Sequence, residues 1–291
     1  MTEPQKGVAS IVAACAIWGF APLYYHHLSE VAAPEMMAHR TVWTALCFGL
    51  VVTLTGRWGQ VRALLTGTDR WRLLAAALLI GLNWSLFIWA VVAGHAVEAS
   101  LGYYIYPLVS ALLGVVLFGE RLAGLQALGV AAAALAVGVL TYGLGVAPVV
   151  SLVLAVSFAL YAAAKKRIAA PAMISVLAEV LLIAPPLVAL LVWLVVRGQA
   201  ADGLGHGWFG RDLYHSLMLP LAGPLSGGPL ILFSYGAQRV RLATSGLAQY
   251  LNPTLQFFSA WLILAEPVTL WHALALVLIW TAIGLYALGR R

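Results

Sequence analysis

A few ionisable side chains interrupt long apolar stretches of the sequence, and these are the first residues that could do chemistry. Glu179 lies inside one such stretch, and His39 and Arg40 lie near the start of another, with Glu35 one helical turn before His39. A charge in the middle of a membrane-spanning helix costs about 2.5–3.5 kcal/mol, so it is expected to face a cavity or a partner. Glu179 or His39 could therefore carry a coupling proton or form an ion pair, and Arg40 could bind a carboxylate. Alternatively, Arg40 reaches outward to a nearby membrane surface.

Amide, aromatic and proline side chains form a second set of candidates. Tyr104 and Pro107 recur in the same spacing as Tyr250 and Pro253. A proline inside a helix frees a carbonyl, which in lipid must meet protein or a water-lined cavity. Pro107 and Pro253 are therefore predicted to act as gating kinks, although a bend that only serves packing gives the same pattern. The residues predicted to bind substrate are Trp18, Arg40, Asn83, Trp84, Tyr104, Tyr106, Tyr161, Tyr250 and Asn252.

Glycine and proline cluster in the segment GPLSGGPL, residues 223–230. Such an interruption of an apolar segment is typical of a binding site between broken helices, which makes Gly227 and Gly228 candidates for gating. Close packing of small residues against a neighbouring helix is the competing interpretation.

The amino-acid composition indicates what surrounds these residues. The 291-residue chain is 63% hydrophobic and only 9% charged, too few polar groups to cover a surface that faces water. Cys15 and Cys47 both lie in apolar stretches, so they predict neither a disulfide framework nor a metal site. The sequence therefore predicts an all-α polytopic membrane protein with a lipid bilayer as its surroundings and no cofactor.

Ten apolar stretches are long enough to cross a bilayer. They span residues 7–27, 34–55, 72–93, 97–118, 123–142, 148–165, 172–196, 213–236, 243–264 and 269–288. Thirteen of the 16 Lys and Arg residues fall in segments on the side of the termini, two (Arg197 and Arg211) fall on the other side, and Arg40 lies within a span. The positive-inside rule then places both termini in the cytoplasm.

A shift of 146 residues aligns the chain with itself, which indicates an internal repeat. Residues 79–140 and 225–286 match at 12 of 62 positions, and the matches include Tyr104 with Tyr250, Pro107 with Pro253, and Glu120 with Glu266. Each half holds five predicted spans, so equivalent helices cross the membrane in opposite directions. We expect two inverted five-helix repeats, residues 1–146 and 147–291, an arrangement associated with transporters that bind substrate between the halves.

Several motifs together resemble the EamA-type members of the drug/metabolite transporter superfamily, and specifically their RarD branch. The matching stretches are GVASIVAACAIWGFAPLYY, PEMMAHRTVW, GLNWSLFIWAV, EASLGYYIYPL, LFGERL and, in the second half, LNPTL. The resemblance implies a ten-helix fold of two inverted repeats in a bacterial inner membrane and export of small molecules.

The predicted function is thus secondary-active export of a small amphipathic metabolite, amino-acid-like, or of a drug, by alternating access, with proton coupling as one option. An uncoupled facilitator or channel is the main alternative. An intramembrane hydrolase using Ser226 and His272 is the enzymatic alternative, but no HExxH motif supports catalysis. No GxxxxGK[ST] motif is present, so no ATPase function is expected of this chain. Nothing predicts a nucleic-acid partner, and the oligomeric state is left open.

Overall fold

Helices make up almost all of the described structure, a computed structural model in which residues 1–28, 30–92, 96–122, 124–145, 149–197, 207–263 and 269–289 are described. No strand occurs among these residues. The helices are α1 (Glu3–His26), α2 (Ala33–Leu54), α3 (Trp58–Thr66), α4 (Arg70–Val92), α5 (Ala96–Phe118), α6 (Gly124–Leu144), α7 (Val149–Arg167), α8 (Ala172–Arg197), α9 (Leu213–Ala237), α10 (Leu242–Ala248), α11 (Leu251–Leu262) and α12 (Leu270–Leu288).

Local sequence signals explain where the first and ninth helices begin. Thr2 caps α1, because its hydroxyl accepts a hydrogen bond from the Gln5 N–H while the Gln5 side chain accepts one from the Thr2 N–H. Asp212 caps α9 by accepting a hydrogen bond from the His215 N–H at 2.8 Å. Both caps satisfy donors that a helix N-terminus leaves unpaired.

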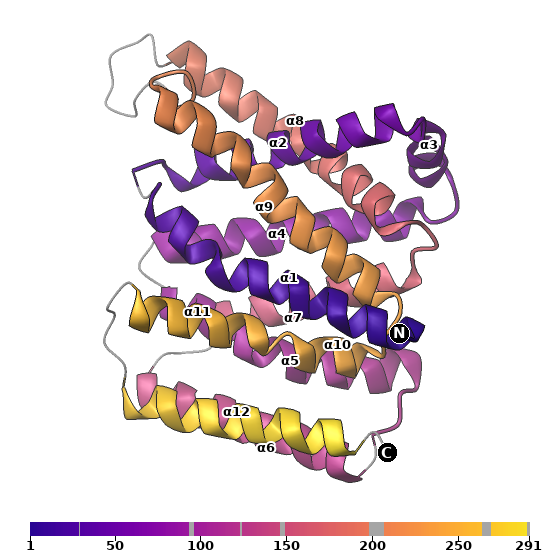
Figure 1. Cartoon of the computed structure of the whole chain (residues 1–291), viewed down its shortest axis with the longest axis vertical. Coiled ribbons are helices and arrows are strands. Elements are labelled where there is room, and N and C mark those ends of the chain that lie inside the picture. The colour runs from indigo at the N-terminus through magenta and orange to yellow at the C-terminus, as the bar shows by residue number, and fades with distance from the viewer. Residues whose placement is uncertain are drawn as a thin grey trace.

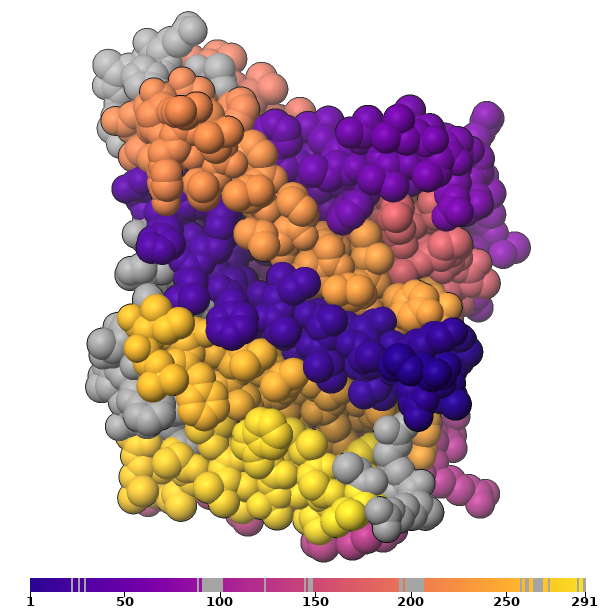
Figure 2. Space-filling view, in the orientation of Figure 1, coloured from indigo at the N-terminus to yellow at the C-terminus, as the bar shows by residue number. Residues whose placement is uncertain are grey.

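Apolar length and apolar surface both indicate a bilayer environment. Six helices of the described structure are long and apolar enough to cross a membrane: α1, α2, α6, α7, α8 and α9. Large apolar side chains on the outside of the bundle are well exposed, for example Val116 at 68% and Val277 at 67%. A water-soluble protein would rarely expose so many large apolar side chains. Figure 2 shows one face of the molecule, over which α9, α1, α11 and α12 follow one another from top to bottom.

Several helices of the first half of the chain pack against helices of the second half. α6 packs against α12, α2 against α8, and α5 against α10. In addition, α1 lies between α9 and α11, while α7 packs against both α4 and α5. The N-terminus and the end of α12 lie at the same end of the bundle, on the right in Figure 1. We call this the termini end, and the other the distal end.

The ninth predicted span, residues 243–264, is not one helix, which corrects the interpretation of Pro253. The segment divides into α10 and α11 at Gln249 and Tyr250, and Pro253 stands in the first turn of α11. A proline in a first turn removes no helical hydrogen bond, because that N–H would have no partner within the helix. Pro107, in contrast, lies inside the continuous helix α5. The two related Tyr-Xaa-Xaa-Pro segments therefore adopt different conformations.

The predicted interruption of the eighth span is absent, because α9 runs unbroken from Leu213 to Ala237. Its glycines instead allow close packing on α2. A Cβ atom at Gly227 would overlap the Phe48 ring, and one at Gly223 would lie 2.6 Å from the Trp43 carbonyl carbon. Small residues four apart let two helix backbones approach in a membrane, which is the competing interpretation of this segment.

This packing predicts that Gly223→Ala destabilises the protein by about 1–3 kcal/mol, because the new methyl group would overlap the α2 backbone. Gly228→Ala is the matched control on the same helix, since a Cβ atom there would have no neighbour within 4 Å. Melting temperatures in detergent measure both effects. Equal melting temperatures for the two variants would contradict a close α2–α9 contact.

Candidate functional site

An interhelical cavity lies between α1, α2, α4, α5, α7, α9 and α11, in the half of the bundle toward the distal end. Its volume is about 100 Å³. Five of the nine residues predicted to bind substrate line it: Trp18, Arg40, Asn83, Trp84 and Asn252. The residues that join them are Ala21, Tyr24, Tyr25, Phe87, Tyr103, Phe158, Leu225, Ser226 and Gln256. Arg40 is the one charged side chain among the described lining residues, so the cavity is aromatic, polar and positively charged.

Arg40 lies in the cavity and does not extend to the membrane surface. Its guanidinium carbon stands 3.6 Å from the centroid of the Trp84 ring, a close cation–π contact. Its Nε atom is buried and has no hydrogen-bond partner. An unpaired buried donor is costly, and a guanidinium pairs strongly with an anionic group such as a carboxylate. Arg40 is thus arranged to receive an anionic group.

The three amides of the cavity are held in place by backbone and side-chain hydrogen bonds. Asn83 donates from its Nδ2 atom to the Leu154 carbonyl at 2.8 Å and to the Ser157 hydroxyl at 2.9 Å. Asn252 accepts from Gln256 at 3.1 Å. These contacts fix the Asn83 side chain against α7. Asn252 and Gln256 form a hydrogen-bonded pair on the α11 side of the cavity.

A layer of stacked aromatic rings closes the cavity toward the termini end. Phe158 lies 5.3 Å from Phe233 and 5.8 Å from Tyr161, in stacked geometry, and 4.9 Å from Tyr106. Trp18 packs on this layer, 6.3 Å from Phe158. Tyr106 and Tyr161, which the sequence predicts as substrate contacts, are therefore one layer deeper than the cavity and fully enclosed.

Tyr104 and Tyr250, also predicted to contact substrate, lie away from the cavity. Their rings are 6.5 Å apart, in a buried cluster that includes residues of α6 and α12. Tyrosine serves a packed core as well as a binding surface, so its position along a helix does not distinguish the two.

Glu179 has a buried partner that the sequence does not reveal. The Lys165 ammonium lies 2.5 Å from the Glu179 carboxylate, and both side chains are almost completely enclosed. The Tyr161 hydroxyl donates to the other carboxylate oxygen at 3.1 Å, and Lys165 also donates to Ser175. Lys165 is the last residue of the predicted span 148–165 and counts among the thirteen basic residues on the side of the termini, so this buried pair corrects its assignment to a surface segment. The ion pair lies between the aromatic layer and the termini end.

His39 lies at the distal end, outside the cavity lining. Its Nε2 atom is 3.5 Å from Glu35, and its ring packs against Phe209 at 5.7 Å. Glu35 also accepts a hydrogen bond from the Trp208 N–H at 2.6 Å. His39 and Glu35 therefore join α2 to the segment that precedes α9.

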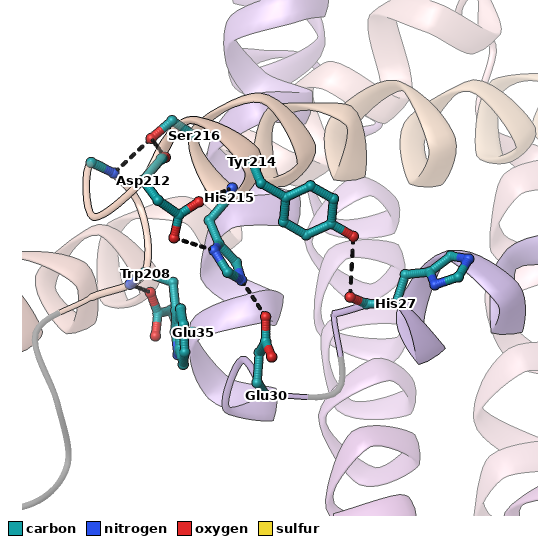
Figure 3. Close-up of polar contacts among 9 residues, drawn as sticks. His27, Glu30, Glu35, Trp208, Asp212, Tyr214, His215 and Ser216 are labelled. Atoms are coloured by element: carbon teal, nitrogen blue, oxygen red, sulfur yellow. Dashed lines mark hydrogen bonds and ion pairs between the residues drawn. The ribbon is translucent and has the colours of Figure 1, made fainter.

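A second polar cluster at the same end ties α9 to the α1–α2 connection (Figure 3). The His215 ring lies between the carboxylates of Asp212 and Glu30, with both N···O distances at 2.6 Å. Tyr214 donates to the His27 carbonyl at 3.3 Å. The backbone and ring N–H groups of His215 outweigh desolvation and lower the Asp212 pKa.

Glu120 organises the termini end. Its carboxylate accepts hydrogen bonds from the Lys166 ammonium at 2.7 Å, from the Leu242 N–H at 2.7 Å and from the Ala243 N–H at 3.2 Å. Burial would raise the Glu120 pKa, but these three donors together outweigh that effect and lower it. The ionised Glu120 therefore joins the end of α5, the end of α7 and the start of α10. The sequence identified Glu120 only as a repeat match of Glu266.

The cavity residues that sequence reasoning missed are mainly aromatic. Tyr24, Tyr25, Phe87 and Tyr103 belong to runs in which neighbouring aromatic residues compete for the same role. Gln256 is one that could have been found, because a polar amide one helical turn from Asn252 lies on the same helix face.

A polytopic helical bundle with an internal, positively charged aromatic cavity is the architecture of a membrane transporter, and comparisons with known proteins agree. Residues 5–142 match the EamA-like transporter family. The chain is 39% identical to Protein RarD of Streptomyces exfoliatus over 97% of this chain and 88% of that protein. It is 36% identical to a protein of Vibrio cholerae named an uncharacterized transporter, over 98% of this chain and 93% of the other. The chain therefore belongs to the EamA-like transporter family, in its RarD branch, and is a multi-pass membrane protein.

A solved crystal structure has the same fold. It superposes with a TM-score of 0.74 over 98% of this chain and 99% of the other, at 19% sequence identity.

Proposed function

We propose that the chain is a secondary-active exporter of a small amphipathic, amino-acid-like metabolite or drug, and that it works by alternating access. The cavity is the observation that carries this proposal. It combines one half-buried cation with aromatic walls, and it ends at a packed aromatic layer part of the way through the bundle. A site that is reachable from one side and sealed from the other is what alternating access requires.

The architecture that goes with this function has ten spans in two inverted repeats, residues 1–146 and 147–291. The spans are α1, α2, α4 to α9, α10 with α11, and α12, while α3 lies outside them. Helix packing supports the repeat. The contact of α4 with α7 corresponds to the contact of α9 with α1, and the contact of α5 with α7 corresponds to the contact of α11 with α1. α6 and α12, which are repeat equivalents, pack on each other.

The orientation follows from the basic residues, which collect in segments at the termini end. Both termini then lie in the cytoplasm of a bacterial cell with the protein in its inner membrane, and the cavity lies in the periplasmic half. Exposed Arg57, Arg62, Arg70 and Arg72 around α3 belong to that cytoplasmic side.

The solute has a carboxylate that Arg40 binds and an apolar or aromatic part that Trp18, Trp84 and Phe87 contact. Proton coupling through Glu179 is part of the proposal. An uncoupled facilitator is the alternative, since Arg40 is the one charge among the described residues that line the cavity.

Counterflow in proteoliposomes tests the function. Vesicles preloaded with an unlabelled aromatic amino acid should accumulate the labelled compound transiently, and vesicles loaded with an uncharged sugar should not. An imposed proton gradient should raise the initial rate if Glu179 couples protons, whereas an equal rate with and without the gradient would support the facilitator. Absence of counterflow for every amphipathic carboxylate tested would contradict the proposal.

A further inference from the structure

Four buried polar side chains lie between α5 and the α10–α11 break without a complete set of hydrogen bonds. The Tyr106 hydroxyl lies within interaction distance of the Ser110 and Ser245 hydroxyls, but none of the three makes a hydrogen bond of good geometry. The amide nitrogen of Gln249 is also unpartnered. Exposure of these residues is 3% or less. Buried polar groups in proteins are almost always satisfied, so such a cluster needs a physical reason.

The internal repeat supplies that reason. When the sequence is aligned with itself at a shift of 146 residues, polar residues that line the cavity align with residues of the unpartnered cluster. The pairs are Tyr103 with Gln249, Asn252 with Tyr106, and Gln256 with Ser110. The repeat also pairs Phe87 of the cavity with Phe233 of the aromatic layer. The cluster is thus the counterpart, toward the termini end, of the cavity wall that is open in this structure.

Helix α10 covers the cluster from the termini end. It packs on α5 without intervening side chains, because a Cβ atom at Gly246 would lie 2.7 Å from the Ser110 Cβ atom and 3.1 Å from the Pro107 carbonyl oxygen. The helix is only seven residues long and is separated from α11 at Gln249 and Tyr250. A short segment with a break at one end can move as a unit.

The Glu120 carboxylate holds the other end of α10. It accepts from the first two N–H groups of that helix, and Lys166 of α7 neutralises it. Arg241, just before α10, lies 3.8 Å from the same carboxylate. Hydrogen bonds to an ionised acceptor are about twice as strong as neutral ones, so these contacts favour the closed position.

We propose that Tyr106, Ser110, Ser245 and Gln249 form a second polar subsite, closed in this state, and that Glu120 locks α10 over it. When the bundle opens at the termini end, the subsite takes water and the uncharged hydrogen-bonding groups of the solute. This inference rests on the proposed alternating access, and it identifies the residues that replace Tyr103, Asn252 and Gln256 in the other state.

Cysteine accessibility tests the proposal in membrane vesicles. Ser245→Cys is introduced into a chain in which Cys15 and Cys47 are replaced by alanine, and a membrane-impermeant methanethiosulfonate reagent is added from the termini side. We expect slow labelling when Glu120 is present and labelling about tenfold faster with Glu120→Gln, because that change removes charge from the acceptor. Lys166→Met, which leaves the carboxylate on α10, should accelerate labelling less.

Ala136→Cys is the matched control, because it is equally buried on α6 and lies outside the proposed pathway. It should stay unlabelled in both backgrounds. Labelling of Ser245→Cys no faster than that of Ala136→Cys, or only from the distal side, would overturn the subsite. Equal rates for the Glu120, Glu120→Gln and Lys166→Met chains would overturn the lock.

Counterflow on the same preparations separates this proposal from the function on which it rests. If counterflow is observed but Ser245→Cys is not labelled, the proposed transport function is supported and the subsite is refuted. Labelling without counterflow supports the moving α10 and refutes transport of the solute tested.

Discussion

Lys165→Met is expected to destabilise the protein by about 3–5 kcal/mol, a larger loss of stability than the one expected for Gly223→Ala. The substitution leaves the Glu179 carboxylate enclosed, with only the Tyr161 hydroxyl as a partner. An enclosed charge without a counter-charge is far more costly than an apolar replacement of the whole pair. Melting temperatures in detergent should therefore fall steeply for Lys165→Met.

The double variant Lys165→Met with Glu179→Leu is the control for this effect. It removes both charges together, so most of the lost stability should return. A double variant as unstable as Lys165→Met alone would show that the pair acts through packing, not through charge.

Glu179→Gln tests proton coupling, but it also leaves the Lys165 ammonium enclosed without a counter-charge, so its melting temperature should fall as well. If Glu179 carries the coupling proton, the variant inserts into the membrane normally, but its counterflow no longer responds to a proton gradient. Normal transport by this variant at every pH tested would contradict the proton-carrier hypothesis and leave the ion pair as a structural element.

The second large effect is expected at Arg40, where replacement by glutamine should weaken binding of an aromatic carboxylate by about 100-fold. The reason is that no other charged group lines the cavity among the described residues. Phenylacetate and phenylacetamide form a matched pair of probes, since they differ mainly in charge. Quenching of Trp18 and Trp84 fluorescence can report the binding of each.

Arg40→Lys refines this test. Lysine keeps the charge but loses the planar group that stacks on Trp84, so it should recover only part of the affinity. The carboxylate preference should disappear in Arg40→Gln and persist, weakened, in Arg40→Lys. Equal affinity of the unchanged protein for phenylacetate and phenylacetamide would contradict the assignment of Arg40.

Much of the fold could be predicted from the sequence, because lipid imposes simple rules. Apolar length locates the helices, and a polar side chain within such a helix must face protein or a cavity. This reasoning found Arg40, Asn83 and Asn252, whose side chains have no good place in lipid. It also indicated that Glu179 has an interior partner as one of its options.

The remaining features depend on packing that no single segment encodes. Lys165 at the end of an apolar stretch has the same sequence pattern as a surface lysine, and only its contact with α8 shows otherwise. Tyr104 and Tyr103 are adjacent, yet one lies in a core cluster and the other in the cavity. Likewise Pro107 and Pro253 have similar sequence contexts, and only tertiary contacts decide which helix breaks.

The lone cation of the cavity also has an electrical consequence. Arg40 belongs to the protein, so its charge does not leave with the solute, and a monoanion bound there carries one net negative charge across the bilayer. A membrane potential of 100 mV, negative inside, contributes about 2.3 kcal/mol to moving that charge outward. This corresponds to about a fiftyfold concentration ratio. For a monoanionic solute such as phenylacetate, the voltage of a living cell would by itself drive export, and transport by this protein would be measurable as a current. A zwitterionic amino acid carries no net charge, so its uncoupled transport would give no current.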